Sequence, residues 1–393
     1  MRLLSAAACA GMLVFGVVMA LLGAVLPLVS ARLGFDLAQA GELFLVMNFC
    51  MLLCSLGVGP AMDRFGMKAP MALGPVAVGG ALVMVASAGS FQVLLVAVAL
   101  LGLGGGALNS AANTLVADLH TDAARKNAAL NLLGVFFGFG ALLLPFVIGS
   151  LLHRIGLAYI LGTAAVLCAG VAACCAWLRF PAAKQGSGVA GEAVLGFLRR
   201  PIVWGFALLL FCESGNEFLL GGYISTYLAR EIRLTLSAAS YALAGFWAAI
   251  MVSRALSSRL LLRVPGHQVV TLSAVVSALA SGVLAAAGSA LMAVLAVAVL
   301  GFALAGIYPT TLGLAGARFA EHSGTVFGIL FTVAMAGGMT LPWTVGQIAN
   351  AYGMRMGLAI APAAFLVILA LLAVILRLER RDCPSRFPNE STG

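Results

Sequence analysis

Two glutamates four residues apart, Glu213 and Glu217, stand inside an apolar stretch predicted at 202–229. At a helical rise of about 1.5 Å per residue they lie about 17 and 23 Å from its start, near the middle of a bilayer, on one helix face. Charge is costly at that depth and the two carboxyls repel, so at least one is expected to stay protonated near neutral pH. Such a group can couple transport to protons or bind a hydroxylated solute. Alternatively, both are packing acids, protonated or paired with Arg254.

Arg254 is a basic residue inside the next apolar stretch, predicted at 237–261. It lies about 11 Å from the end of that stretch, so its long side chain can extend part of the way out of the membrane. It either forms an ion pair with Glu213 or stabilises the C-terminal end of a helix. We favour the structural role.

Two asparagines, Asn109 and Asn113, share a face of the predicted span 91–118 in the sequence GLGGGALNSAANTL. The glycines form no dinucleotide-binding motif, because no strand precedes them, and they are better explained by close helix packing. Buried amides need hydrogen-bond partners. The two asparagines therefore either bind substrate or tie helices together.

Aromatic and amide side chains on other predicted spans could complete a binding site, since aromatic rings stack on sugar faces and amides bind hydroxyls. For each one singly, packing or anchoring at the membrane interface is an equal alternative. The candidates are Tyr223, Trp247, Tyr308, Trp343 and Gln347, with Tyr227, Asn350 and Asn48 beside them.

The elements that position these residues follow from the composition. The 393 residues are 63% hydrophobic and 9% charged, whereas about a quarter of the residues of soluble proteins are charged. Each apolar stretch approaches or exceeds the roughly 20 residues that cross a bilayer as a helix. The sequence therefore predicts an all-α membrane protein with 12 transmembrane helices. The predicted spans are 8–31, 38–61, 69–89, 91–118, 127–152, 156–178, 202–229, 237–261, 267–288, 290–316, 323–350 and 355–377.

An internal repeat divides the chain into two halves. A shift of 199 places Gly23 on Gly222, Arg64 on Arg263 and the stretch 33–41 on 232–240; a shift of 197 aligns the Gly and Pro residues of the fifth and eleventh spans, including Pro145 with Pro342. We predict two pseudo-symmetric six-helix bundles with a cavity between them. The predicted parts are a bundle at 1–178, a cytoplasmic linker at 179–201, a bundle at 202–377 and a cytoplasmic tail at 378–393.

Basic residues gather at one side of the predicted spans. Sixteen of the 22 Lys and Arg residues fall on the side of the termini, five fall on the other side, and Arg254 lies within a span. The positive-inside rule then places both termini in the cytoplasm. The net charge of +9 forms no compact basic patch, so no nucleic-acid partner is expected. We predict a monomeric, multi-pass protein of a bacterial inner membrane, with the lipid bilayer, protons and a small solute as its partners.

The loop between the second and third spans has a patterned sequence, GPAMDRFGMK, at 59–68. It resembles the GxxxDRxGRK loop of the major facilitator superfamily, with Met67 in place of an arginine. Gly59 is expected to allow close helix approach and Gly66 a tight turn, while charged groups hold the loop in the cytosol. The resemblance implies the MFS fold and a loop that latches the two halves; an ordinary charged turn is the alternative. The latch residues are Gly59, Asp63, Arg64, Gly66 and Lys68.

Three stretches, in the fourth, seventh and eleventh spans, resemble the fucose–galactose–proton symporter branch of that superfamily: GLGGGALNSAANTL, GNEFLLGGYISTYL and GGMTLPWTVGQIANAYG. The resemblance implies that Asn113 and Glu217 face the substrate. The branch also has two acids in its first half, where this chain has Gly23 and Asn109. Proton coupling is therefore expected to have moved to Glu213 and Glu217.

These features predict a secondary active transporter that moves a small hydroxylated solute, a sugar or derivative, by proton-coupled symport and alternating access. The alternative is proton-driven efflux of amphipathic compounds. Efflux members carry Gly-Pro and paired glycines in the fifth span, and this chain has GVFFGFGALLLPFVIGS there. The eight cysteines form no CxxC pair, and no HExxH, GxSxG or histidine-rich cluster occurs, so we expect no enzyme activity, metal or cofactor.

Overall fold

The computed structural model describes residues 2–119, 123–181, 196–260, 264–319 and 323–382, and within these ranges it contains helices and turns but no strand. The all-α class is confirmed. The first half contains α1 (Arg2–Leu33), α2 (Leu37–Phe65), α3 (Lys68–Ser87), α4 (Phe91–Leu119) and α5 (Ala123–Trp177). The second half contains α7 (Pro201–Arg230), α8 (Leu236–Leu260), α9 (Gly266–Ala285), α10 (Ala290–Leu304), α11 (Ile307–Arg318), α12 (Ser323–Tyr352), α13 (Met354–Leu358) and α14 (Ile360–Asp382).

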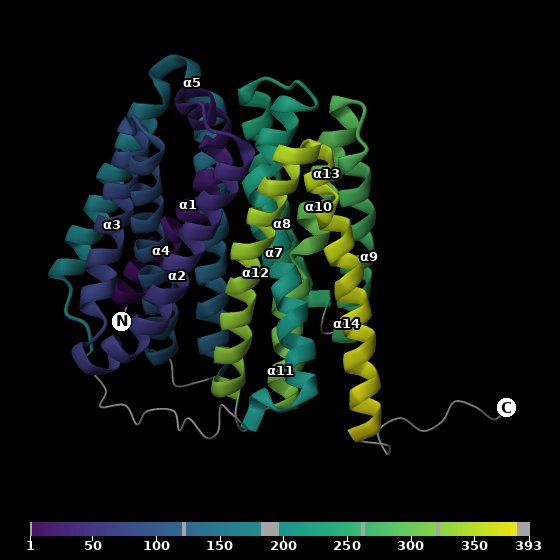
Figure 1. Ribbon diagram of the computed structural model, residues 1–393. Helices are drawn as coiled ribbons and strands as arrows, with labels where there is room; N and C mark the ends of the chain where they lie inside the picture. Colours follow the sequence, from purple (N-terminus) through teal and green to yellow (C-terminus); the bar gives the residue numbers. More distant parts are fainter. Residues whose placement is uncertain (1, 120–122, 182–195, 261–263, 320–322, 383–393) are drawn as a thin grey trace.

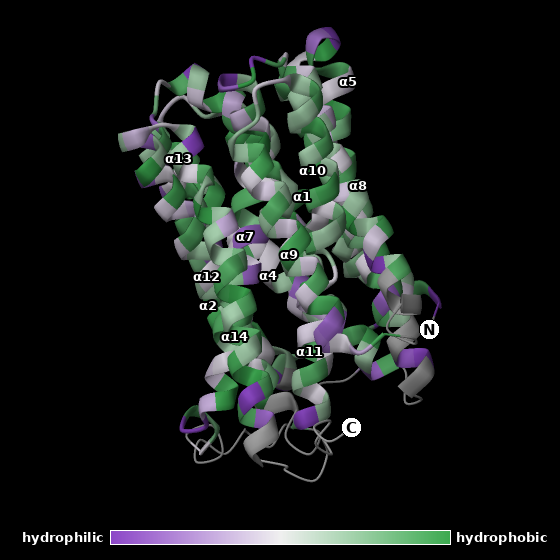
Figure 2. Ribbon diagram, turned by 90° about the vertical axis from the view of Figure 1, so that its right-hand side faces the viewer, coloured by the Kyte–Doolittle hydropathy of each residue, from purple (hydrophilic) through white to green (hydrophobic). Residues whose placement is uncertain are grey.

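Twelve membrane crossings follow from these helices. Eleven helical segments are long and apolar enough to cross a membrane. One of them contains a break at Gly156, where φ is 75° and ψ is 162°, so α5 crosses twice. The prediction of twelve spans is therefore confirmed. In Figure 2, hydrophobic residues dominate the middle of the bundle and hydrophilic ones gather toward its two ends, with further hydrophilic ribbon near α7.

Two predicted spans are divided. The span predicted at 290–316 separates into α10 and α11, which meet at Ala305 and Gly306. Pro309 has no backbone N–H, so the helical hydrogen-bond pattern cannot continue unbroken through this point. The last span begins with the short α13 and continues as α14 to Asp382, past the predicted end at 377. Residues 182–195 of the predicted linker and 383–393 of the predicted tail lie outside the described residues.

The two halves stand side by side, with the first half in purple to blue and the second in teal to yellow (Figure 1). They meet mainly through three helix pairs, α2 with α12, α5 with α8, and α1 with α7, with a smaller contact between α1 and α8. We call the end that carries the first residue of α7 and the last residue of α11 the termini end. The opposite end, with the turns at Gly34, Gly156, Arg233 and Gly353, is the distal end.

The repeat read from the sequence is present in the packing. In the first half α1 crosses α5 at two glycines, because a Cβ added at Gly16 would collide with the Phe137 carbonyl and one at Gly140 with the Leu13 carbonyl. In the second half α7 crosses α12 in the same way through Gly215 and Gly337. These glycines are related by the offsets of 199 and 197. The prediction of two pseudo-symmetric bundles is confirmed.

Turns at the distal end repeat the same backbone conformation. Gly156 (φ 75°, ψ 162°) and Gly353 (φ 92°, ψ 158°) are related by the offset of 197. Gly34 (φ 69°) and Arg233 (φ 59°) are related by the offset of 199. Arg233 is the one described non-glycine residue with positive φ, a conformation in which its Cβ is crowded.

Candidate functional site

The carboxyl pair lies on α7, whose side chains are buried along almost its whole length. Glu213 is 1% exposed and Glu217 is 9% exposed, so the protein encloses both carboxyls and neither faces lipid. Glu213 Oε2 has no hydrogen-bond partner. Glu217 keeps 11% of its side chain accessible and is the more reachable of the two acids.

Arg254 on α8 pairs with Glu217, since its Nη2 lies 3.3 Å from Glu217 Oε1. Of the alternatives left open, pairing with Glu213 is wrong, because Glu217 is the acid with a carboxylate oxygen within ion-pair distance of the guanidinium. The Arg254 side chain is 31% accessible, and its Nε has no partner. The pair is therefore only partly desolvated on the arginine side.

One aromatic ring lies against the guanidinium and is the first of a chain of packed rings. The Arg254 Cζ lies 5.7 Å from the ring centroid of Phe137, which belongs to α5 of the first half. Phe137 meets Trp247 edge to face at 6.2 Å, and Trp247 packs on Phe246 at 5.5 Å. Trp247 is fully buried with its Nε1 unpaired, so its ring is part of the helix packing beside the ion pair.

Tyr308 approaches the same charges from α11. It belongs to the same neighbourhood as Glu213, Glu217 and Arg254, because α11 packs against α7. Its ring stacks on Phe331 with the centroids 6.5 Å apart. The structure thus gathers four of the predicted site residues at one level of the second half: both glutamates, Arg254 and Tyr308.

The predicted asparagines lie in the first half and bind each other. Asn113 Nδ2 donates to the Asn109 carbonyl at 2.8 Å and to Asn109 Oδ1 at 3.0 Å. It also lies 4.0 Å from the Met12 sulfur on α1. Both side chains are half-buried. The two residues thus satisfy part of each other's hydrogen bonding.

Three further candidates lie where the halves meet near the distal end. Tyr223 donates to the Pro342 carbonyl at 3.2 Å and packs on Phe44 at 5.2 Å. Gln347 donates to the Ala38 carbonyl at 3.5 Å, which joins α12 to α2. The backbone of Trp343 touches Gly41, and its side chain is 38% exposed. These contacts agree with the packing alternative for Tyr223 and Gln347.

The predicted latch loop forms the turn between α2 and α3. Gly66 has φ 83° and permits the tight turn, and Lys68 begins α3. Arg64 is exposed and lies over the Phe65 ring at 5.2 Å. The expected close helix approach at Gly59 is wrong, since no heavy atom lies within 4 Å of a Cβ built there. The Asp63 side chain and the counterpart residues 261–263 lie outside the described residues.

Sequence reasoning did not identify Phe137 or the crowding at Gly23. A Cβ at Gly23 would collide with the Gly221 carbonyl, and Ser225 Oγ donates to the Gly23 carbonyl. The first position where the symporter branch has an acid is therefore a point of backbone contact between the halves. For Phe137 the available signal was its repeat mate, Ala334, because an aromatic residue in one half only breaks the symmetry.

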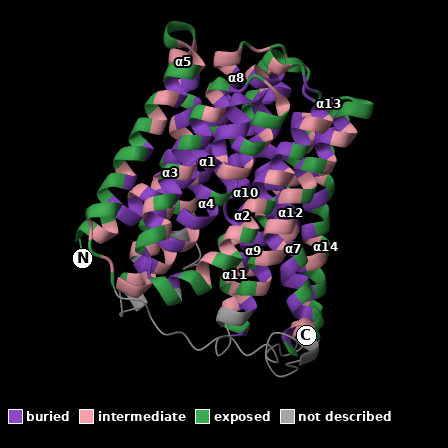
Figure 3. Ribbon diagram, turned by 60° about the vertical axis from the view of Figure 1, so that its left-hand side comes forward, coloured by how far each residue is buried: buried purple, intermediate pink, exposed green. Residues whose placement is uncertain are grey.

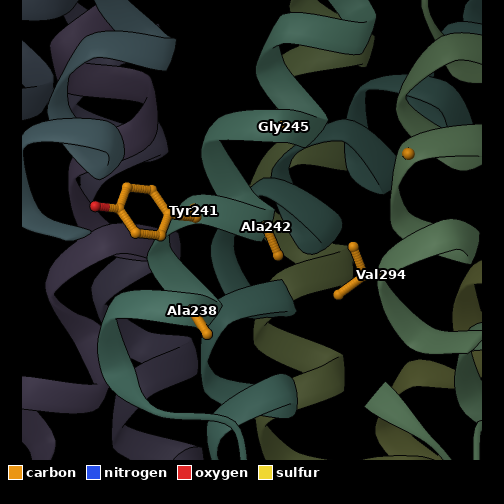
Figure 4. Close-up of a pocket in the computed structure, with 6 residues that line it drawn as sticks. Ala238, Tyr241, Ala242, Gly245 and Val294 are labelled. Carbon is orange, nitrogen blue, oxygen red and sulfur yellow. The ribbon is translucent and has the colours of Figure 1, made fainter. Parts of the chain in front are cut away.

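A pocket of about 310 Å³ lies elsewhere, beside α8 and α10 (Figure 4). Its lining is apolar apart from Tyr241, and the hydroxyl of that ring points away from Ala242 and Val294. No carboxyl or amide lines this pocket, so it does not suit a hydroxylated solute. The lining residues are Ala238, Tyr241, Ala242, Gly245, Val294 and Ala298.

Comparison with known proteins agrees with this arrangement. The model of the Major Facilitator Superfamily matches residues 8–215 and 206–392. The chain belongs to the major facilitator superfamily. No curated protein sequence matches it closely enough to count as a relative.

Solved structures of transporters share the MFS fold. The nucleoside transporter NupG is 14% identical, with a TM-score of 0.82 over 95% of this chain and 99% of that one. The fucose:proton symporter FucP of E. coli is 20% identical, with a TM-score of 0.66 over 94% and 98%. A bacterial homologue of the human lysosomal transporter Spinster, in an inward-facing and occupied conformation, is 14% identical, with a TM-score of 0.77 over 96% of each chain.

Proposed function

We propose that this superfamily member is a secondary active transporter that moves a small hydroxylated solute, a sugar or sugar derivative, together with protons. The observation that carries the proposal is the Glu217–Arg254 pair with Glu213 enclosed beside it. Buried ionisable groups within membrane helices are costly and occur mainly at functional positions. Glu217 is the group we assign to take and release the proton, because it is the acid with an accessible edge and a cationic partner.

The groups around this pair suit a hydroxylated solute. Tyr308 from α11 and the Asn109–Asn113 pair from α4 offer hydroxyl and amide groups from opposite halves. The solutes named for two structural neighbours, fucose and nucleosides, both carry a hydroxylated sugar ring. We assign solute binding to the level of Glu217, Asn109, Asn113 and Tyr308, with Trp247 supporting the site from behind.

The closed contacts near the distal end support alternating access. Ser225 with Gly23, Asn350 with Asp36, and Tyr241 with Ser150 join the two halves there. We propose that both termini lie in the cytoplasm of a bacterial cell, so that this arrangement is closed toward the outside. Entry of solute from outside then requires these contacts to separate.

Transport into proteoliposomes with an imposed pH gradient tests the proposal. Fucose, galactose and nucleosides form the first solute panel, and wild type is compared with Glu217→Gln and with Glu42→Gln, an exposed carboxyl on α2. We expect gradient-driven accumulation in the wild type and in Glu42→Gln. Glu217→Gln should lose accumulation and keep solute exchange, because exchange needs no net proton movement. Undiminished accumulation in Glu217→Gln would rule out its coupling role.

A further inference from the structure

The contact between α5 and α8, which we call the α5–α8 seam, runs from the distal end to the level of the ion pair. At its outer edge Tyr241 Oη donates to Ser150 Oγ at 3.1 Å. Further in, a Cβ at Gly138 would lie 3.2 Å from the Cβ of Met251. Arg254 follows Met251 by three residues, so the guanidinium stands at the inner edge of this seam.

Arg254 contacts both halves of the molecule. Its guanidinium lies over Phe137 of the first half at 5.7 Å and pairs with Glu217 of the second half at 3.3 Å. Glu213 forms no hydrogen bond to it, so Glu217 is the anion that holds it in this position. A cation is attracted to an aromatic face, and the attraction grows as water is excluded. The position of one side chain thus affects the contact between the halves.

We propose that Arg254 couples the charge of Glu217 to the α5–α8 seam, an inference that rests on the proposed proton-coupled transport. While Glu217 is ionised, it holds the guanidinium over Phe137 and the seam stays closed. A proton on Glu217 removes the counter-charge. Arg254 then extends toward water, which already reaches 31% of its side chain, and leaves the ring. The seam loses its innermost contact and separates more readily.

The groups that face Glu217 are few. Glu213 lies on the same helix, Arg254 on α8 and Tyr308 on α11. Helices α1, α10, α12 and α14 carry no carboxyl, basic residue or tyrosine at this level among the described residues. A change in the charge of Glu217 therefore acts first on Arg254.

A disulfide reporter in the seam tests the proposal without any solute. The variant Gly138→Cys/Met251→Cys brings two Cβ atoms close to the separation of about 3.5–4.5 Å that disulfides adopt. Its rate of cross-linking by copper–phenanthroline is measured at one fixed pH in four backgrounds: wild type, Glu217→Gln, Arg254→Gln and Glu42→Gln. The matched control is Gly79→Cys, which faces the native Cys168 within the first half at a Cβ separation of 3.3 Å. Each single-cysteine variant shows what the native cysteines contribute.

We expect Glu217→Gln and Arg254→Gln to slow the seam reporter roughly tenfold, the size of effect that a partly desolvated cation–π contact can produce. Glu42→Gln should leave the reporter unchanged, and the Gly79→Cys control should react equally in all backgrounds. Phe137→Leu should slow the reporter and remove any further effect of Glu217→Gln. Because Arg254→Gln leaves Glu217 without a partner and can reduce folding, the neutral double variant Glu217→Gln/Arg254→Gln is measured as well, and it should match Glu217→Gln.

Equal cross-linking rates in wild type, Glu217→Gln and the double variant would overturn the proposal. So would a slowing by Glu217→Gln that persists unchanged in Phe137→Leu, since the ring would then play no part. Loss of proton-driven accumulation in Glu217→Gln with an unchanged seam reporter leaves the proposed function standing and removes only the Arg254 link. If instead Glu217→Gln slows the seam reporter but accumulation is undiminished, the Arg254 link stands and the coupling role of Glu217 in the proposed function falls.

Discussion

The two halves of the molecule share one set of helix crossings and differ in their chemistry. Gly16 and Gly140 join α1 to α5 as Gly215 and Gly337 join α7 to α12. At mid-depth, however, the first half has neutral amides, and the second half has two carboxyls and an arginine. Both halves therefore have the same helix crossings, whereas the acidic and basic groups at mid-depth lie only in the second half among the described residues. The first half supplies a ring, Phe137, that lies against the Arg254 guanidinium of the charged half.

The largest effect is expected where the two halves are most alike. Gly16→Leu and Gly337→Leu each drive a side chain into the backbone of a crossing helix, so each should cost at least about 3 kcal/mol or prevent folding. Gly162→Leu is the control, since nothing lies within 4 Å of its Cβ position. The stability of the three purified variants is measured by thermal unfolding, with size-exclusion chromatography as the readout of folded protein. A tolerated leucine at either crossing would contradict the shared packing.

The second largest effect is expected from a substitution that disturbs the contact between the halves and leaves each half folded. Gly23→Ala places a methyl group against the Gly221 carbonyl, across the contact between α1 and α7. We expect the protein to fold and its transport to fall at least tenfold, because the distal contacts can no longer close. Gly57→Ala, which meets open space, should transport normally. Normal transport in Gly23→Ala would show that this contact is not needed.

A smaller effect concerns the one distal turn at which the halves differ in residue type. Arg233 adopts the positive φ that glycine adopts at the equivalent Gly34. Arg233→Gly should raise the free energy of unfolding by up to about 1 kcal/mol, and Gly34→Ala should lower it by about as much. Equilibrium unfolding in detergent measures both variants. A destabilised Arg233→Gly protein would mean that the arginine side chain compensates for its backbone.

The smallest expected effect distinguishes a contact between the halves from one within a half. Tyr241→Phe removes the hydrogen bond to Ser150 across the seam, and Tyr227→Phe removes a 2.7 Å hydrogen bond to the Leu284 carbonyl within the second half. Each should cost about 0.6 kcal/mol, a typical value between membrane helices. Only Tyr241→Phe should also slow the seam disulfide. Equal slowing by Tyr227→Phe would mean that the reporter senses general loosening.

Hydropathy and the repeated glycines were enough to predict the spans, the two bundles and the mid-depth position of the carboxyls, because each depends on residues close together in the chain or on a fixed offset. The partner of Arg254 could not be predicted. Glu213 and Glu217 share a helix face, so the acid that pairs with Arg254 depends on how α7 and α8 are positioned along each other, which the sequence does not give. The prediction of close helix packing at Gly59 failed for a similar reason, since a glycine can permit close approach without a neighbouring helix being there.

The distal turns described above also limit where the protein can bend. The turns at Gly34, Gly156, Arg233 and Gly353 are short and each is fixed by one left-handed residue. Each turn restricts the angle between the two helical segments that it joins, and these segments include every helix of the three main contacts between the halves. We therefore expect these turns to bend little when the halves separate. The bending should occur within the helices instead, several of which carry an internal proline.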